Sequence, residues 1–260
     1  MEKRFEIKTQ IIGSGSGACN DAVHAASQPE PEVQEGRVLN GLIRLTKDGW
    51  EVEPDQRHAD IIVHELQLHE ARAVNTPREP EAREDEEDNA EPRSAEMASQ
   101  YRALSARANY LAQDRSDIGF AVKELSRKMS NPTWGDFVAL RRLGRYLKDN
   151  KRAVLEFEYQ NWDGGITVWC DSDFAGCKRT RRSTSGGVWM LGMHCIKTWC
   201  ATQGAYALSS AEAELYGMIE GATRAKGLVS LASELGFGSI SGIVSLGTDS
   251  TAAKRFVSRR

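Results

Sequence analysis

Two aspartates in the C-terminal part of the chain each end an apolar segment and could share one site. Asp171 ends the segment 166–171 (ITVWCD), and Asp249 ends the segment 243–249 (IVSLGTD). Both segments predict β-strands. In open α/β sheets the carboxyl ends of parallel strands face the functional crevice. If these two strands are neighbours, their terminal aspartates lie together at that edge of the sheet.

A third carboxylate comes from the helix predicted over residues 210–235. Ser209 and Glu212 have the spacing of a capping box, in which the glutamate reaches back to the start of the helix. Glu214 lies about 200° further round the helix, at 100° per residue, so the two glutamates cannot both face a sheet. The face of Glu214 continues through Met218 and Ala225, and a carboxylate at the end of an apolar stripe is costly in a purely structural role. We therefore assign Glu212 to capping and Glu214 to chemistry.

Asp171, Glu214 and Asp249 together predict a catalytic metal site. Clustered carboxylates repel one another unless cations bind them, and Mg²⁺ prefers oxygen ligands of this kind. Two ions (Mg²⁺, with Mn²⁺ as a substitute) about 3.5–4 Å apart would clamp the attacking and leaving oxygens of an in-line phosphoryl displacement. Taken singly, each acid fits an ordinary strand-end or surface role better, but their joint placement favours the metal site. Asp173 could assist the metal or open the turn that follows, and we favour the turn.

A basic cluster follows the first of these strands and predicts contact with an anionic substrate. Its cations are Lys178, Arg179, Arg181 and Arg182, and the hydroxyl groups of Ser183 and Ser185 come next. Cations near a carboxylate site would offset the repulsion of an anionic substrate. Hydroxyl groups and backbone amides can bind phosphates. The alternative is a solvated loop.

A second basic set lies on the helix expected after the break at Asn131-Pro132. The core stripe of that helix is Phe137, Leu140, Leu143 and Leu147. Another face carries Arg141, Arg145 and Lys148 at i, i+4 and i+7. These cations could follow a phosphate backbone, although a set like this more often forms a solvated face.

The composition is that of an ordinary globular protein. The 260 residues are 40% hydrophobic and 27% charged, with a formal net charge of −3. Five cysteines without a C-x-x-C pair predict neither disulfides nor a zinc site and favour a reducing compartment. The sequence has no signal-peptide pattern and no apolar run near the ~20 residues of a membrane span. We expect an intracellular protein without membrane contact, and leave a cytoplasmic particle and the nucleus both open.

The N-terminal part of the chain divides into two segments of different composition. Residues 1–72 mix strand and helix signals, with a hairpin around Asp48-Gly49 and a helix over 55–68. Residues 73–100 follow, with seven acidic residues against one arginine between 81 and 91. A segment with so little to bury cannot offset its ordering entropy, so we predict a disordered linker.

The remaining residues also form two segments. Residues 101–160 are strongly helical, and Ser116 and Thr133 stand where N-caps are expected. Residues 161–260 switch to α/β, with further strands predicted over 184–191 and 195–200 and the start of a last helix over 250–257. Three strands, a helix, a strand and a helix predict a mixed sheet with helices packed against it.

Three segments around these residues closely resemble the RNase H region of copia-type LTR retrotransposon Pol polyproteins. They are 171–176 (DSDFAG), 180–186 (TRRSTSG) and 207–216 (ALSSAEAELY). Earlier segments are similar to the sequence that leads into this region from the reverse transcriptase. They are 101–104 (YRAL), 110–118 (YLAQDRSDI), 125–132 (LSRKMSNP) and 145–148 (RYLK). The resemblance covers about residues 101–258 and extends more weakly to the first 70, which look like the end of the polymerase palm and the thumb.

The resemblance implies a fold, a site and a reaction. The fold is α/β, an RNase H-like mixed sheet with flanking helices, preceded by a helical region like a reverse transcriptase thumb or connection. The family's metal-binding acids match Asp171, Glu214 and Asp249. The implied reaction is hydrolysis of the RNA strand of an RNA–DNA hybrid, leaving 3′-hydroxyl and 5′-phosphate ends. Substrate choice would rest on the shape of the hybrid and its 2′-hydroxyls.

Two departures from the family pattern limit these expectations. Family members place a further metal-proximal acid, and a final strand and helix, beyond the segments found here, so the domain is C-terminally incomplete and the strand over 243–249 becomes an edge. The chain contains no Asp-Asp pair, so we expect no polymerase activity.

The sequence therefore predicts a fragment of a retrotransposon Pol polyprotein with weak or absent nuclease activity. Its expected partners are an RNA–DNA hybrid and other parts of the Pol polyprotein. A non-catalytic, nucleic-acid-binding remnant of a decayed retroelement is the main alternative, and a remnant that folds poorly is another.

Overall fold

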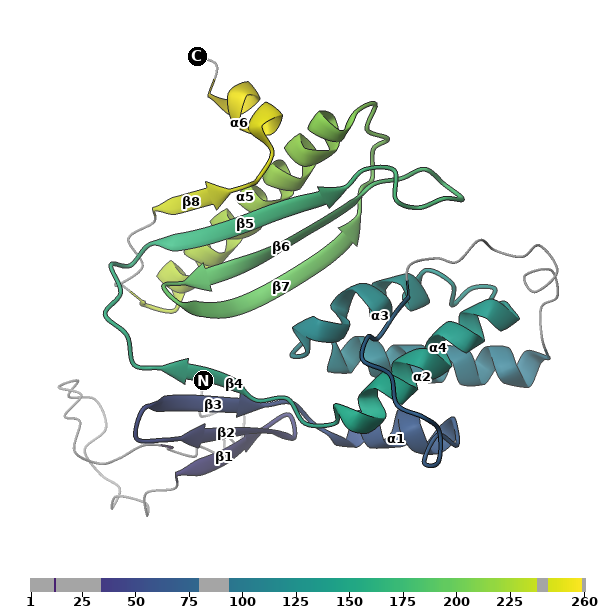
Figure 1. Ribbon diagram of the computed structural model, residues 1–260. Coiled ribbons are helices and arrows are strands. Elements are labelled where there is room, and N and C mark those ends of the chain that lie inside the picture. The colour runs from purple at the N-terminus through teal and green to yellow at the C-terminus, as the bar shows by residue number, and fades with distance from the viewer. Residues whose placement is uncertain (1–11, 13–33, 80–93, 238–242, 259–260) are drawn as a thin grey trace, which may run out of the picture.

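A computed structural model describes residues 12, 34–79, 94–237 and 243–258 of the chain. Over these residues the protein is mixed α/β, with two four-stranded sheets and six α-helices. One sheet lies beside a group of helices, and the other carries a long helix along one face (Figure 1).

The first sheet joins strands from distant parts of the sequence. Its order is β1 (Glu35–Val38), β2 (Gly41–Leu45), β3 (Gly49–Glu53) and β4 (Leu155–Glu158), all antiparallel. The predicted hairpin around Asp48-Gly49 is confirmed by the pairing of β2 with β3. A side chain at Gly49 would overlap the Phe157 carbonyl, so the glycine allows β4 to approach.

Four helices share the core next to this sheet. They are α1 (Arg57–Glu65), α2 (Ala95–Leu111), α3 (Gly119–Ser126) and α4 (Trp134–Asp149). The predicted stripe on α4 is confirmed, because Phe137, Leu140, Leu143 and Leu147 are all buried. They pack in one cluster with Ile62 of α1 and Tyr101 of α2. The residues predicted as separate segments 1–72 and 101–160 thus contribute to one core.

Two helix boundaries differ from the predicted ones. The helix expected over 55–68 ends at Glu65, because Gln67 adopts a left-handed conformation with φ of 53°. α2 begins at Ala95, inside the segment expected to be a linker. The Ser94 hydroxyl accepts a hydrogen bond from the Met97 N–H, and Met97 packs against the helical core. The most acidic part of the predicted linker lies outside the described residues.

One of the two predicted N-caps is confirmed. Thr133 and Asp136 form a capping box at the start of α4. The prediction for Ser116 is wrong, because this residue is the first of the 3₁₀ turn η1 (Ser116–Ile118), whose N-cap is Arg115. The preceding Arg115 is buried, pairs with Asp117 and donates to the Asn150 carbonyl. Tertiary contacts therefore fix this turn.

The second sheet has the order β7-β6-β5-β8. Its strands are β5 (Ile166–Asp173), β6 (Thr184–Leu191), β7 (His194–Thr202) and β8 (Val244–Gly247). β5, β6 and β7 are antiparallel neighbours, whereas β8 pairs with β5 in parallel. The two strands that were expected to bring Asp171 and Asp249 together are therefore adjacent, and β8 is an edge strand.

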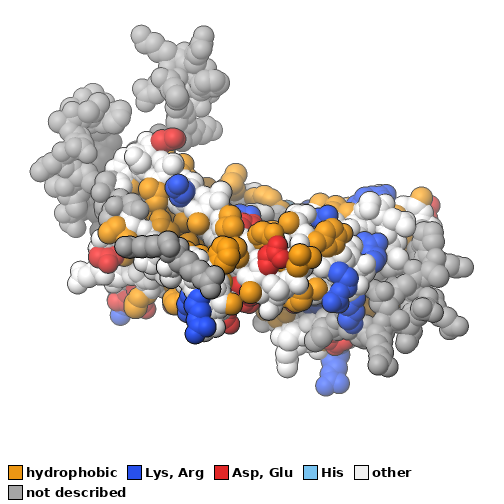
Figure 2. Space-filling model, turned by 90° about the horizontal axis from the view of Figure 1, so that it is seen from above, with side chains coloured by type: hydrophobic (Ala, Val, Ile, Leu, Met, Phe, Trp, Pro, Cys, Tyr) orange, Lys and Arg blue, Asp and Glu red, His pale blue; other side chains and the backbone are white. Residues whose placement is uncertain are grey.

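The long helix α5 (Ser210–Glu234) packs along one face of this sheet, and α6 (Thr251–Val257) follows β8 (Figure 1). α5 comes close to β5 because Gly221 lies against the Cys170 Sγ and Val168, and Ala225 is fully buried beside them. The outer side of α5 and α6 exposes apolar residues, among them Leu231 and Phe256. Figure 2 shows hydrophobic side chains spread across the face of the molecule that is seen from above the view of Figure 1.

Four of the five cysteines lie among the described residues. Cys170, Cys177, Cys195 and Cys200 are all free thiols, as predicted, and Cys19 lies outside the described residues. In the described part of the chain, no helix combines the length and apolar character needed to cross a membrane.

Candidate functional site

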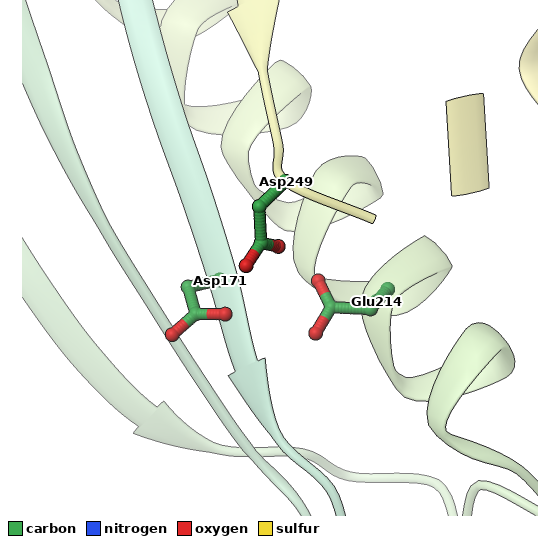
Figure 3. A group of neighbouring side chains, drawn as sticks. All are labelled: Asp171, Glu214 and Asp249. Atoms are coloured by element: carbon green, nitrogen blue, oxygen red, sulfur yellow. The ribbon is translucent and has the colours of Figure 1, made fainter. Parts of the chain in front are cut away.

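Asp171, Glu214 and Asp249 converge at one edge of the second sheet (Figure 3). Each offers a carboxylate oxygen, and these oxygens all lie within 4.8 Å of one another. Asp171 comes from β5, Glu214 from near the start of α5, and Asp249 from the connection between β8 and α6. Among the residues that the structure describes, this is the one group of three or more acidic, histidine or cysteine side chains that could hold a metal ion.

Strand register places the two aspartates at the same level. Trp169 of β5 pairs with Gly247 of β8. Asp171 comes two residues after Trp169, and Asp249 comes two residues after Gly247. The two neighbours of Asp249, Thr248 and Ser250, are both held by local hydrogen bonds. The buried Thr248 hydroxyl accepts from the Ser250 N–H, and Ser250 caps α6. Local hydrogen bonds therefore fix the backbone of Asp249 although its strand has ended.

The two glutamates of α5 point in different directions, as predicted, and Glu212 takes the capping role. The Ser209 hydroxyl accepts from the Glu212 N–H, and Glu212 Oε2 accepts from the Leu208 N–H at 2.8 Å. Glu212 therefore caps the helix. It accepts from the N–H of the residue before the N-cap, whereas in the usual capping box it would accept from the N-cap residue itself. Glu214 points to the other side of the helix, toward the aspartates (Figure 3).

Ser172 holds one oxygen of Glu214 in place. Its hydroxyl donates a hydrogen bond of 2.8 Å to Glu214 Oε1. The second oxygen, Oε2, is buried and has no hydrogen-bond partner among the residues that the structure describes. Ser172 was not among the predicted site residues. The alternation of β5 contained the signal, because Ser172 follows Val168 and Cys170 on the face that α5 covers.

The environment of Glu214 makes its negative charge costly. Burial raises the pKa of its carboxyl group, and the charges of Asp171 and Asp249 raise it further, while the hydrogen bond from Ser172 opposes this shift. A divalent cation would offset both the burial and the repulsion. The unpartnered Oε2 and the two exposed aspartates supply the oxygen ligands that Mg²⁺ prefers. The residues present therefore fit the metal predicted for them.

Asp173 takes the structural role that we favoured. It is the last residue of β5 and pairs with Thr184. A side chain at Gly176 would overlap the Asp173 carboxylate, so this carboxylate lies over the turn. It does not belong to the group of three acids.

The basic cluster lies in the loop between β5 and β6. Lys178, Arg179 and Arg181 are exposed, whereas Arg182 is half-buried. The side chains of Ser183 and Ser185 are not available to phosphates, because these residues are 1% and 0% exposed. The Ser183 hydroxyl accepts from the Ala175 N–H, and the Ser185 hydroxyl accepts from the Gln203 amide. We therefore reassign both serines to holding the loop and strand in place.

The three cations of α4 contact the protein itself. Arg141 donates to the Leu66 carbonyl at 3.0 Å, Arg145 to the Arg72 carbonyl, and Lys148 to the Ala71 carbonyl at 2.9 Å. These carbonyls belong to the irregular segment after α1. The cations therefore fasten that segment to α4, and their contact with phosphates stays a prediction.

Several known proteins are similar to this chain. The uncharacterized mitochondrial protein AtMg00810 of Arabidopsis thaliana is 36% identical over 116 residues, which cover 45% of this chain and 48% of that protein. The retrovirus-related Pol polyprotein from transposon RE1 of the same plant is 33% identical over 137 residues, 53% of this chain and 9% of that protein. The secreted RxLR effector protein 161 of Plasmopara viticola is 33% identical over 118 residues, 45% of this chain and 82% of that protein.

The extent of these matches differs between relatives. The chain spans about half the length of the mitochondrial protein and less than a tenth of the RE1 polyprotein. The Pol polyprotein from transposon RE2 matches over a similar share, at 31% identity. No protein-family model and no solved structure matches the chain. The chain belongs to the same family as the RxLR effector protein 161, and its similarity to the RE1 and RE2 polyproteins supports an origin in a retrotransposon Pol polyprotein.

Proposed function

We propose that residues 161–260 form an RNase H-type nuclease domain that hydrolyses the RNA strand of RNA–DNA hybrids. The observation that carries this proposal is the convergence of Asp171, Glu214 and Asp249, whose oxygens lie within 4.8 Å of one another. The resemblance of the surrounding segments to copia-type RNase H sequences and the retrotransposon Pol relatives support it.

The three carboxylates would hold two Mg²⁺ ions. Such ions, when bound, activate a water molecule and stabilise the charge that develops on the attacking and leaving oxygens of a phosphodiester. The chain's own part is to fix the ligands before the substrate arrives. β5 and β8 set the spacing of the aspartates, and Ser172 orients Glu214. Asp171 on β5 and Glu214 on α5 are held by regular elements, and ligands held in this way lose little conformational freedom on binding.

The exposed cations of the β5–β6 loop support a nucleic-acid substrate. Lys178, Arg179 and Arg181 follow β5 directly, so they lie at the edge of the sheet that carries the acids. Cations at this position would bind the phosphates that flank the cleaved bond. Among the described residues only three carboxylates meet at the site, so we expect weak hydrolysis by the isolated chain.

A cleavage assay on the purified chain tests this function. A labelled RNA–DNA hybrid is incubated with the chain and Mg²⁺, beside Asp171→Asn and a reaction with EDTA. We expect slow cleavage of the RNA strand that both the substitution and EDTA abolish. Robust cleavage that Asp171→Asn leaves untouched would contradict the assignment of the site.

A second function, binding without cleavage, is favoured by the exposed basic loop. In that case hybrid binding depends on Lys178, Arg179 and Arg181, and adding Mg²⁺ yields no cleavage products. Titrating the hybrid with and without Mg²⁺ separates the two functions. Replacing one of these lysine or arginine residues by alanine should weaken binding and lower its salt dependence.

A further inference from the structure

Two loops leave the second sheet at the edge that carries the acids. Asp173 of β5 pairs with Thr184 of β6, which in turn pairs with Thr202 of β7. The β5–β6 loop and the loop between β7 and α5 therefore start side by side. Asp171 lies two residues inside this edge, about 7 Å along the strand. A ligand bound to both loops would therefore lie at the same end of the sheet as Asp171.

An aromatic ring of one loop stacks on a cation of the other. The guanidinium carbon of Arg182 lies 5.0 Å from the centre of the Tyr206 ring. Tyr206 is nevertheless 57% exposed, and Leu208 beside it is 88% exposed. The arginine therefore supports the ring without covering it.

Buried hydrogen bonds hold both loops in this arrangement. Gln203 is buried, and its side-chain amide donates to the Ser185 hydroxyl and to the Ala213 carbonyl, both at 2.9 Å. Its backbone N–H donates to the Ser183 carbonyl. In the β5–β6 loop, the Cys177 N–H donates to the Arg182 carbonyl. The platform of Tyr206 and Arg182 is thus built before any ligand binds.

We propose that Tyr206 and Arg182 form a stacking platform for an unpaired nucleobase of a single-stranded extension that leaves the hybrid at the site. This inference rests on the proposed function and names the form of nucleic acid that the site prefers. An exposed ring backed by a guanidinium group suits the face of any base, because stacking does not depend on the pattern of hydrogen-bond donors. Bases within a duplex are already stacked on their neighbours, so the platform is useful only for an unpaired base. The exposed arginines of the β5–β6 loop, Arg179 and Arg181, would bind the phosphates of that extension.

The test compares two probes in the absence of divalent metal. One is a blunt hybrid, and the other is the same hybrid with a short single-stranded extension. We expect the full chain to bind the extended probe more tightly. Tyr206→Ala should lose about tenfold in affinity for that probe, which corresponds to about 1.4 kcal/mol, and little for the blunt one. Tyr206→Phe, which keeps the ring, should bind like the unchanged chain.

A matched control and a spectroscopic readout separate stacking from a loss of folding. Tyr159 is also an exposed tyrosine but follows β4 in the other sheet, so Tyr159→Ala should bind both probes normally. 2-Aminopurine in the extension should lose fluorescence when it stacks on the unchanged chain or on Tyr206→Phe, and keep it with Tyr206→Ala. Equal loss of affinity for both probes in Tyr206→Ala, or no preference for the extended probe, would overturn the platform.

Failure of the platform and failure of the nuclease give different results. If the chain cleaves hybrid in an Asp171-dependent way while Tyr206→Ala binds both probes normally, the platform is wrong and the nuclease stands. If the extended probe binds through Tyr206 and no cleavage occurs with Mg²⁺, the platform stands and the nuclease is wrong.

Discussion

Ser172 of β5 orients the carboxylate of Glu214 on α5. Its hydroxyl donates to Glu214 Oε1 and leaves Oε2 for a ligand. We expect Ser172→Ala to weaken Mg²⁺ binding or Mg²⁺-dependent activity about 10- to 100-fold, as loss of a hydrogen bond to a metal ligand commonly does. Ser172→Thr keeps the hydroxyl and should retain most of the affinity. A Mg²⁺ titration of cleavage or of thermal stability measures both, and equal behaviour of the two variants would contradict this role.

Glu214 should make the stability of the metal-free chain depend on pH. Burial and then the neighbouring aspartates raise its pKa above the ordinary value of 4.5. The folded chain therefore holds this proton more tightly than the unfolded chain. The corresponding stability is fully present below pH 4.5 and is lost as pH rises through the raised pKa of the folded state.

Glu214→Gln removes this titration and tests it. Without metal, we expect the variant to have a larger free energy of unfolding than the unchanged chain at neutral pH, and a smaller difference below pH 4.5. Mg²⁺ at about ten times its Kd should stabilise the unchanged chain by about 1.4 kcal/mol and the variant by less. Urea denaturation at several pH values, with EDTA or Mg²⁺, measures these effects. A difference between the two proteins that stays constant with pH would contradict the shift.

At the scale of elements, the distance between α5 and β5 depends on Gly221. A methyl group there would overlap the buried Cys170 Sγ and crowd Val168. We expect Gly221→Ala to destabilise the fold by about 1–3 kcal/mol through overpacking. Gly227 lies in the same helix with no atom near a Cβ, so Gly227→Ala should instead stabilise by up to about 1 kcal/mol. Denaturant unfolding compares the two variants. Similar changes in their free energies of unfolding would show that close packing at Gly221 does not limit stability.

Elements from residue 164 onward could be predicted because their patterns are local. Alternation marked β5, β6 and β7, and capping by Ser209 marked the start of α5. Separating Glu212 from Glu214 needed only the helical period. The hydrogen bond from Ser172 needed the additional knowledge that α5 covers that face of β5. The contacts of Arg141, Arg145 and Lys148 could not be predicted, because one helix's periodicity does not reveal which backbone carbonyls a second segment brings to it.

At the scale of the whole molecule, pairing between distant segments was the hardest feature to predict. β4 comes more than a hundred residues after β3, yet the two strands pair. No turn joins them, so no local signal marks the pairing. The two parts of the molecule also touch, through Lys123 of α3 with Thr184 and Arg127 with the Cys177 Sγ. Long-range contacts of this kind follow from shape complementarity between finished elements rather than from sequence patterns.

The position of β8 at the edge of the second sheet places Asp249, the third proposed metal ligand, just after a short edge strand. β8 has four residues, and among the strands that the structure describes it pairs only with β5. Local opening should therefore detach Asp249 while β5 and α5 remain folded. Cation binding and the folding of this segment are then coupled. Mg²⁺ at about ten times its Kd should slow amide exchange in β8 about tenfold, and Asp249→Asn should abolish the slowing. Equal slowing in β6 would point instead to global stabilisation. Cation binding would then not depend on the ordering of β8.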